Sequence, residues 1–268
     1  LRGHEVQVPK VLKPNEFGGE FRGIPIAPGA GDNAGAALGV GAEPGDVVVS
    51  LGTSGTAFAV SETSTHDATG SVAGFADATG NFLPLVCTLN AARILDAACK
   101  LLKVSHDELA NLALSASAGA NGLTLLPYFE GERTPNRPNA RGTLHGLSLN
   151  NSDPANIARA YIEGMLCGLA DAVFSLEKLD VAVNRILLVG GAAKNPAVPE
   201  IASSIFGRKV IVPPPGEYVA NGAARQAAWS LTGQLPNWQI GDTQVIESKH
   251  FPEVFSKYQE LVTKTKNF

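Results

Sequence analysis

The sequence predicts an α/β fold in which helices flank a mixed sheet. Strand-like runs with hairpin spacing come first along the chain, and helical patterns then alternate with short apolar runs. The chain has 268 residues, of which 44% are hydrophobic, so it can bury a large core without disulfides or metal ions. Its length suits one large domain or two small ones.

Charge and cysteine content narrow the class of protein. The net charge is −4 and no block of Lys and Arg occurs, so we expect no nucleic-acid partner. No apolar run reaches about 18 residues, so we expect no membrane-spanning helix. Cys87, Cys99 and Cys167 are an odd number without CxxC spacing, which favours a reducing, cytoplasmic location and no protein metal site.

The strands are predicted from short β-branched runs bounded by glycine or proline. Residues 1–28 are rich in Gly and Pro and are expected to form an irregular lead-in with one short strand near Glu5–Val8. The other strands, in chain order, are Val47–Leu51 with its hairpin partner Thr56–Val60, a hairpin of residues 71–77 and 82–87 around a turn at 78–81, Arg185–Val189 and Val210–Val212.

The helices are predicted from apolar residues at helical spacing and from signals at their ends. Ser105 and Glu108 form a capping-box pattern, Asp153-Pro154 opens a helix, and Gly207 ends one. The helices, in chain order, span Asn90–Lys103, a stretch from Ser105, Asp153–Lys178, Asn195–Phe206, Ala220–Leu231 and Phe251–Thr265.

Asp32 is the first candidate functional residue. It lies in the stretch GAGDNAG at residues 29–35, where small neighbours leave room for a ligand against the carboxylate. Such a carboxylate can accept a proton from a hydroxyl group. The alternative is structural, because Asp is also a preferred N-cap and Asn33–Gly39 is predicted to be helical.

Two glycine turns follow predicted strands. The stretch SLGTSGT at residues 50–56 offers backbone N–H groups and short hydroxyls without bulk, which suits phosphate oxygens. The stretch LLVGGAAKNP at residues 187–196 places Gly-Gly between a strand and a helix, as nucleotide sites do. Neither is a Walker A loop or a GxGxxG fingerprint. The structural alternatives are an ordinary hairpin turn and a tight strand-to-helix turn.

The stretch from Tyr128 to His145 is predicted to be a long charged loop without secondary structure of its own. Loops of this length are usually functional or disordered. Its acidic and basic residues balance locally, so a structural salt-bridge network is an equal alternative.

Five motifs in this order resemble the FGGY carbohydrate kinases, over residues 29 to about 233. Residues 142–164 are similar to the second signature of that family, including Glu163-Gly164. The five motifs are GAGDNAG, SLGTSGT, LLPYFEGERTP at residues 125–135, RGTLHGL at residues 141–147 followed by NIARAYIEG at residues 156–164, and LLVGGAAKNP.

The resemblance implies an RNase H-like domain of the actin/hexokinase-like superfamily. Members have two such domains, and the first carries a DxGT phosphate loop that this chain lacks. We therefore expect the C-terminal half of a kinase, with its own N-terminal domain as a partner. The expected division is a lead-in at residues 1–28, a nucleotide-binding domain at 29–240 and a helical tail at 241–268.

The resemblance also assigns roles to individual residues. Asp32 would be the catalytic base and Asn33 would lie beside it near the sugar. ATP with Mg²⁺ would be held by a larger set, namely Gly52, Thr53, Ser54 and Gly55 for the phosphates, Gly190, Gly191 and Asn195 for adenosine, and the helix from Asn90 alongside.

The expected reaction is phosphorylation of a ketose, D-xylulose, at its primary hydroxyl. The substrate follows from the GERTP stretch and the PNARG stretch after it, residues 131–135 and 138–142, which are most like the D-xylulose kinases of the family. Alternatives are kinases of glycerol, gluconate or ribulose, and a non-catalytic nucleotide-binding module. We also consider a homodimer and an assembly role for the isolated half.

Overall fold

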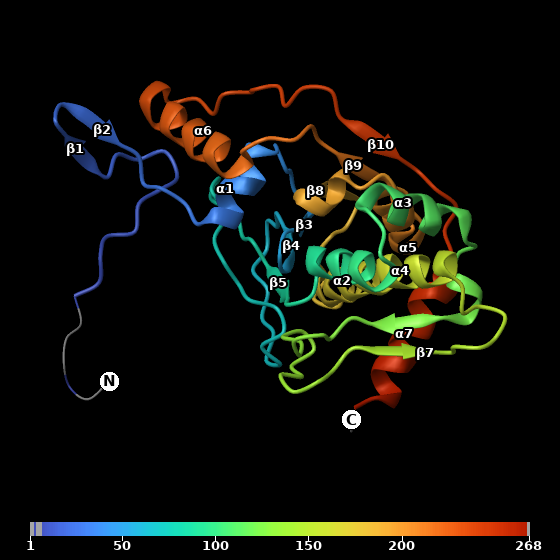
Figure 1. Ribbon diagram of the computed structural model, residues 1–268. Coiled ribbons are helices and arrows are strands. Elements are labelled where there is room, and N and C mark those ends of the chain that lie inside the picture. Colours follow the sequence, from blue (N-terminus) through green and yellow to red (C-terminus); the bar gives the residue numbers. More distant parts are fainter. Residues whose placement is uncertain (1–2, 4–6, 267–268) are drawn as a thin grey trace. The chain divides into compact units, whose positions relative to one another are not determined.

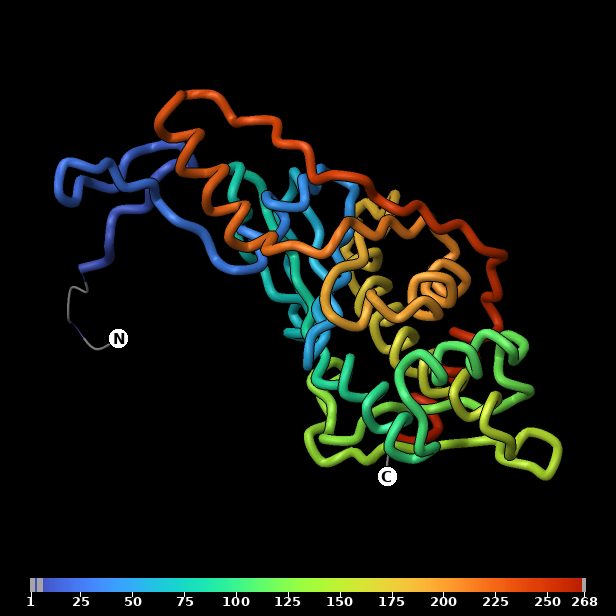
Figure 2. The backbone as a smooth tube through the Cα atoms, turned by 45° about the horizontal axis from the view of Figure 1, so that its top comes forward, coloured from blue at the N-terminus to red at the C-terminus, as the bar shows by residue number. Residues whose placement is uncertain are grey.

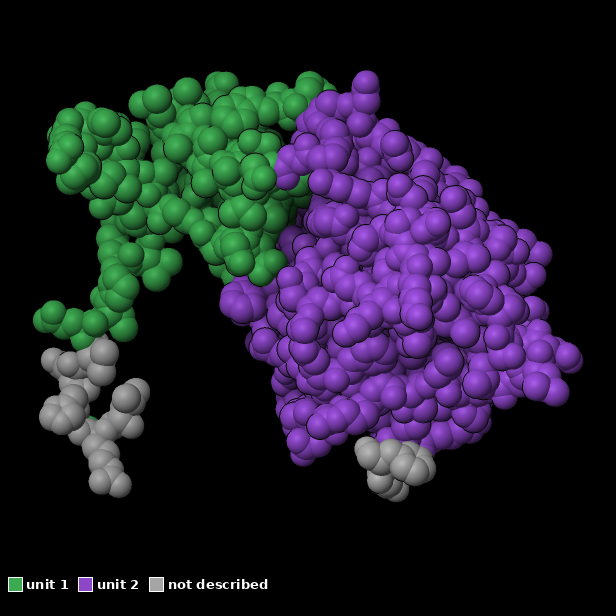
Figure 3. Space-filling view, in the orientation of Figure 1, with its two compact units in different colours: residues 1–41, 76–81, 217–239 green, residues 42–75, 82–216, 240–268 purple. Residues whose placement is uncertain are grey.

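The computed structural model describes residue 3 and residues 7–266, and the chain falls into two compact units. Unit 1 comprises residues 1–41, 76–81 and 217–239, and unit 2 comprises residues 42–75, 82–216 and 240–268 (Figure 3). The strand expected near Glu5–Val8 lies partly outside the described residues, and Gln7 and Val8 are not in a strand.

Unit 2 is built on a six-stranded mixed sheet. Its order is β10-β9-β8-β3-β4-β5, in which β3, β4 and β5 form an antiparallel meander while β8 and β9 continue it in parallel (Figure 1). The register pairs Val48 with Leu187. The strands are β3 (Asp46–Leu51), β4 (Gly55–Ala59), β5 (Leu85–Thr88), β8 (Arg185–Val189), β9 (Val210–Val212) and β10 (Gln244–Ile246), the last antiparallel to β9.

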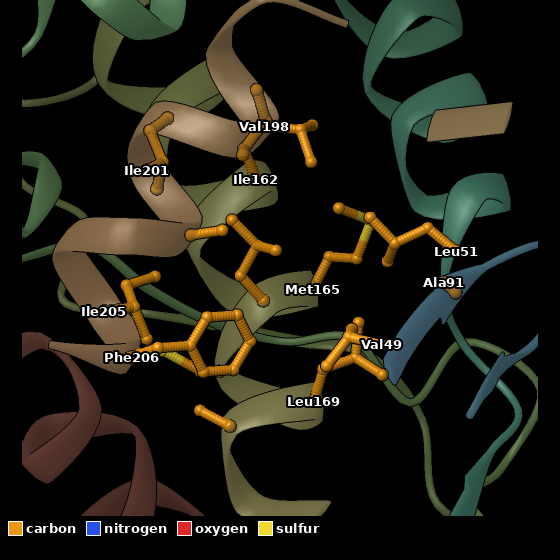
Figure 4. Packing of buried hydrophobic residues seen from close by; sticks show 14 of the residues in the cluster. Val49, Leu51, Ala91, Ile162, Met165, Leu169, Val198, Ile201, Ile205 and Phe206 are labelled. Carbon is orange, nitrogen blue, oxygen red and sulfur yellow. The ribbon is translucent and has the colours of Figure 1, made fainter. Parts of the chain in front are cut away.

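Helix α4 (Pro154–Glu177) forms the centre of the unit 2 core. Asp153 caps it by accepting a hydrogen bond from the Asn156 N–H at 3.0 Å, and Pro154 opens it as predicted. Figure 4 shows Met165 of α4 beside Leu51 of β3 in the core shared with α5 (Ala197–Phe206). Of the 24 residues of α4, 16 are buried, so more than one face of the helix contributes to the core.

Two helices follow β5 in the sequence, and a third is the last helix of the described residues. Lys103, in the left-handed region, ends α2 (Ala92–Leu102), and the capping box of Ser105 and Glu108 opens α3 (His106–Ser115) as predicted. The last stretch of unit 2 is extended, carries β10 and ends in α7 (Pro252–Lys264), which packs on α4 (Figure 2).

The second predicted hairpin is present, but its first arm is not a regular strand. Backbone hydrogen bonds join Ala73 to Leu85, Phe75 to Leu83 and Asp77 to Asn81, residues 71–77 have only bridge positions at Ala73 and Ala76, and the regular strand begins at Leu85. The Asp77 side chain stabilises the turn, because its Oδ1 accepts hydrogen bonds from the N–H groups of residues 79–81. The strands not predicted are short, three residues each, namely β1 (Gly19–Phe21), β2 (Ile24–Ile26), β6 (Thr124–Leu126), β7 (Thr143–His145) and β10.

Unit 1 contains the β1–β2 hairpin and two helices that cross closely. These are α1 (Asp32–Gly39) and α6 (Tyr218–Thr232). A Cβ on Gly222 would overlap the carbonyl oxygen of Gly35, so only glycine permits this approach. Arg225 of α6 donates to the Leu38 carbonyl and, at 3.2 Å, to that of Pro236. These contacts fix α1, whose first residue is Asp32.

In the part of the chain that the structure describes, no helix combines the length and apolar character needed to cross a membrane.

Candidate functional site

A cleft of about 450 Å³ opens in unit 2 at the carboxyl ends of the parallel strands β3 and β8. This edge of an α/β sheet is where ligands usually bind. Four segments line it, namely Leu51–Thr53 at the end of β3, one face of α2 with Ala92, Leu95 and Asp96, the first turn of α3 with His106 and Asp107, and the 3₁₀ turn η2 (Gly191–Lys194) with the following Asn195.

Two glycines of the cleft have open space where a side chain would stand. A Cβ on Gly191 would meet nothing within 4 Å, and one on Gly52 would touch only the Ser54 carbonyl oxygen at 3.4 Å. Neither residue has a positive φ. Because neither the backbone nor the packing requires glycine there, the open space is available to a ligand.

Gly190 and Gly55 differ from those two because the fold itself requires them. Gly190 has a φ of +101°, and a Cβ there would lie 2.6 Å from the Leu51 carbonyl oxygen. A Cβ on Gly55 would lie 2.6 Å from Thr88 Oγ1 and 2.7 Å from Leu169 Cδ2. Neither glycine lines the cleft, and neither does Ser54. Gly190 and Gly55 therefore permit the tight backbone packing of the two turns but do not face the cleft.

Asn195 is buried and joins two walls of the cleft. Its Nδ2 donates to the His106 carbonyl at 3.2 Å, and its Oδ1 accepts from the Ala197 N–H at 3.0 Å. The side chain thus ties η2 and the start of α5 to the first turn of α3. The predicted strand, Gly-Gly and helix order is confirmed, with η2 inserted before α5.

Asn90 lies just before α2 and does not line the cleft. Its buried Nδ2 donates to the Gly131 carbonyl at 2.7 Å and to Glu132 Oε2 at 2.9 Å, and its Oδ1 accepts from the Phe129 N–H. These bonds fasten the start of α2 to the loop that follows β6. From this region Ala92, Leu95 and Asp96 are the residues that reach the cleft.

The sequence reasoning missed four polar residues of the cleft. They are Asp96, His106, Asp107 and Lys194. The pattern around Ser105 explained Asp107 and His106 only as the start of a helix. For Asp96 the sequence did contain a signal, because the helical spacing of residues 92, 95 and 96 places them on one side of a helix. Nothing in the sequence indicated that α3 would bring His106 within 3.1 Å of Asp96.

Asp32 lies in unit 1 as the first residue of α1, and it does not cap this helix, which was its structural alternative. The N-cap is Gly31, and no side chain caps the helix. The exposed Asp32 carboxylate accepts at Oδ1 from the Asn33 N–H at 2.8 Å and from Asn33 Nδ2 at 3.2 Å. Asn33 thus orients the carboxylate, whose other oxygen has no hydrogen bond to the described residues.

The charged loop after β6 is held by hydrogen bonds rather than by the salt-bridge network that was its structural alternative; among the described residues its one ion pair joins Glu130 to Arg93 of α2. Glu132 is buried and accepts from the Leu89 N–H at 2.6 Å and from its neighbour Arg133 at 2.8 Å. Burial raises the pKa of Glu132 above its usual value. Arg137 donates to the Val262 carbonyl at 2.6 Å and so holds the end of α7. Part of the loop, Thr143–His145, is the strand β7.

Glu163 and Gly164, from the second signature, belong to the core. Glu163 forms a buried ion pair with Arg159 at 2.6 Å and accepts from the Gly119 N–H at 2.9 Å. Burial raises the pKa of Glu163, although Arg159 opposes that effect. A Cβ on Gly164 would lie 2.5 Å from the Leu125 carbonyl oxygen, so α4 and β6 pack backbone to backbone there.

Comparison with known proteins agrees with this architecture. Residues 47–231 match the FGGY family of carbohydrate kinases, C-terminal domain. The xylulose kinase of Streptomyces rubiginosus is 40% identical over 255 residues, which cover 90% of this chain and 51% of that protein. The crystal structure of xylulose kinase from Bifidobacterium adolescentis has 48% identity and a TM-score of 0.88, and the match covers 95% of this chain and 53% of that one.

A more distant structure shows the fold alone. Glycerol kinase from Plasmodium falciparum, solved with ADP, has 18% identity and a TM-score of 0.77 over 92% of this chain and 52% of that one. The mixed sheet with flanking helices is thus the fold of the actin/hexokinase-like sugar kinases, which confirms the predicted fold class. The chain belongs to the FGGY family of carbohydrate kinases. It spans about half the length of the relatives it matches.

Proposed function

We propose that this chain is the nucleotide-binding part of a kinase that uses ATP to phosphorylate D-xylulose at its primary hydroxyl, giving D-xylulose 5-phosphate. The observation that carries the proposal is the cleft at the ends of β3 and β8, where Gly52 and Gly191 leave room for a ligand. Membership of a family of carbohydrate kinases supports the reaction class. The relatives named xylulose kinase support the substrate.

In this proposal each of the two turns of the cleft binds a different part of the nucleotide. Gly52 and Thr53 bind the terminal phosphates, since they offer backbone N–H groups and a hydroxyl without bulk. Gly191 and Asn195 bind adenosine. Gly190 and Gly55 shape these turns, Asn90 fastens the start of α2, and Ser54 does not line the cleft. We therefore assign contact with the nucleotide to fewer residues than the motifs alone suggest.

The residues of the cleft fit Mg²⁺ as an ion that binds together with the nucleotide, mainly through its phosphates. Mg²⁺ is commonly bound through substrate phosphates, waters and one or two carboxylates. Among the described residues, no three His, Cys, Asp or Glu side chains converge as a metal site. The chemistry that bound Mg²⁺ supplies in kinases is neutralisation of phosphate charge.

Asp32 is the proposed base. It accepts the proton of the primary hydroxyl of the sugar, and Asn33 orients its carboxylate. Phosphoryl transfer passes through a loose transition state, so positioning and charge neutralisation matter most and a weak base suffices. The first phosphate loop and further sugar contacts lie, in this proposal, in an N-terminal domain. A cytoplasmic location and a homodimer stay predictions.

A panel of sugars offered to the full-length protein tests this function. We expect ADP release in a coupled assay with ATP and Mg²⁺ to depend on D-xylulose. D-ribulose, glycerol and gluconate should give a much lower kcat/KM. Nucleotide binding without any sugar-dependent release would contradict the kinase, and a higher kcat/KM for another compound of the panel would contradict the substrate.

A further inference from the structure

One wall of the cleft carries a hydrogen-bonded group of side chains that the proposed function leaves without a role. Asp96 of α2 and His106 of α3 both line the cleft, and His106 Nε2 lies 3.1 Å from Asp96 Oδ1. On its other side, His106 Nδ1 lies 3.6 Å from the sulfur of Cys99. The group joins two helices at the surface of the cleft.

One tautomer of His106 satisfies both contacts. A histidine N–H at Nε2 donates to the carboxylate, which leaves Nδ1 of the neutral ring to accept from the thiol of Cys99. Burial, and then the charge of Asp96, raise the pKa of Cys99, so the thiol keeps the proton that it donates. Within the described part of the chain, Oδ2 of Asp96 has no hydrogen-bond partner. One carboxylate oxygen is thus fixed and the other is available to a ligand.

Stability does not account for this pair. More than half of each side chain is exposed to solvent. An exposed pair of this kind contributes little to stability, since even a fully charged surface pair contributes only about 0–1 kcal/mol. Asp96 also shares a helix face with Ala92 and Leu95, two small or apolar residues that line the same cleft. The pair therefore provides an oriented acceptor beside an apolar surface.

The charges of the cleft limit what this acceptor can bind. Asp96 and Asp107 make their wall acidic, and Lys194 of η2 is the cation that lines the same cleft. An ionised carboxylate only accepts hydrogen bonds, and it repels phosphate. The turn at Gly52 and Thr53 carries no charge. The acidic wall therefore suits the hydroxyl-bearing sugar of a nucleotide and not its phosphates, which the proposed function places at that turn.

We propose that Asp96, oriented by His106, binds the ribose hydroxyls of the nucleotide and so determines both its orientation and the preference for a ribonucleotide. This inference rests on the proposed function, because it names the nucleoside contacts of the same cleft. Asp96 is the binding residue, and His106 is a positioning residue that acts through it.

Paired nucleotides test the proposal in the full-length protein. We expect ADP to bind with a Kd about tenfold lower than 2′,3′-dideoxy-ADP, which lacks both hydroxyls. In Asp96→Ala the Kd of ADP should rise about tenfold while that of the dideoxy nucleotide stays within about twofold, so that the preference disappears. His106→Ala should reduce the preference, and His106→Gln, which keeps an N–H donor, should restore part of it.

Asp107→Ala is the matched control. It also removes one negative charge from the acidic wall, but from the first turn of α3 instead of from α2. It should change the Kd of both nucleotides by the same factor. Equal binding of the two nucleotides by the wild-type protein, or equal weakening of both by Asp96→Ala, would overturn the role of Asp96. Absence of any ADP binding by the wild type would overturn the proposed function as well. Loss of sugar-dependent turnover alone would leave this inference intact.

Discussion

Asp32→Asn should lower sugar-dependent ADP release by the full-length protein by about 10²–10⁴-fold, the usual contribution of a general base. The substitution removes the group that accepts the proton of the sugar hydroxyl. It keeps the helix, because Gly31 and not Asp32 is the N-cap of α1. An amide oxygen can still accept from the Asn33 N–H, so the local geometry stays close to that of the wild type. The measurement is kcat in the coupled assay with D-xylulose.

Two controls make this result specific. The Kd of ADP and the unfolding temperature of Asp32→Asn should match those of the wild type. Glu20→Gln removes an exposed carboxylate from the same unit and should leave kcat unchanged. If Asp32→Asn keeps its turnover within about tenfold of the wild type, the role assigned to Asp32 is wrong.

Gly190→Ala should destabilise unit 2 by about 2–5 kcal/mol. The residue has a φ of +101°, which costs an L side chain about 1–3 kcal/mol. Its new Cβ would also lie 2.6–2.8 Å from three backbone atoms of Leu51, and overpacking costs a similar amount. Because Leu51 ends β3 in the centre of the sheet, little relaxation is possible. Urea unfolding measures the loss.

Gly191→Ala is the matched variant one residue away. Its Cβ would meet nothing, so stability should change by no more than about 0.5 kcal/mol. We expect instead a Kd for ADP that is roughly fivefold higher, because the methyl group occupies space meant for the nucleotide and costs about one hydrogen bond. A loss of stability in Gly191→Ala equal to that in Gly190→Ala, with unchanged ADP binding, would contradict the separate roles of the two glycines.

Much of the fold could be predicted because its long elements have strong local patterns. The β-branched run at Val47–Leu51, the capping box of Ser105 and the Asp153-Pro154 start each predicted an element that the structure confirms. The strands that were missed have three residues each, and, apart from the local β1–β2 hairpin, they pair with residues far away in the sequence. Strand β6 pairs with β7 across the loop of residues 127–142, and no local signal encodes that pairing.

The candidate site was predictable at its turns and not at its walls. Gly52, Thr53, Gly191 and Asn195 follow strands in a pattern that the sequence shows, and the structure gathers them at one cleft. Asp96 and His106 come together only through the packing of α2 against α3, which depends on the left-handed Lys103 between them. The roles of Gly190 and Gly55 became distinct only once their backbone neighbours were placed.

A crystal structure of the full-length protein with ADP tests most directly whether this cleft is the nucleotide site. The account predicts the phosphates beside Gly52 and Thr53 and the adenosine beside Gly191 and Asn195. ADP bound elsewhere, or an empty cleft at saturating ADP, would contradict it.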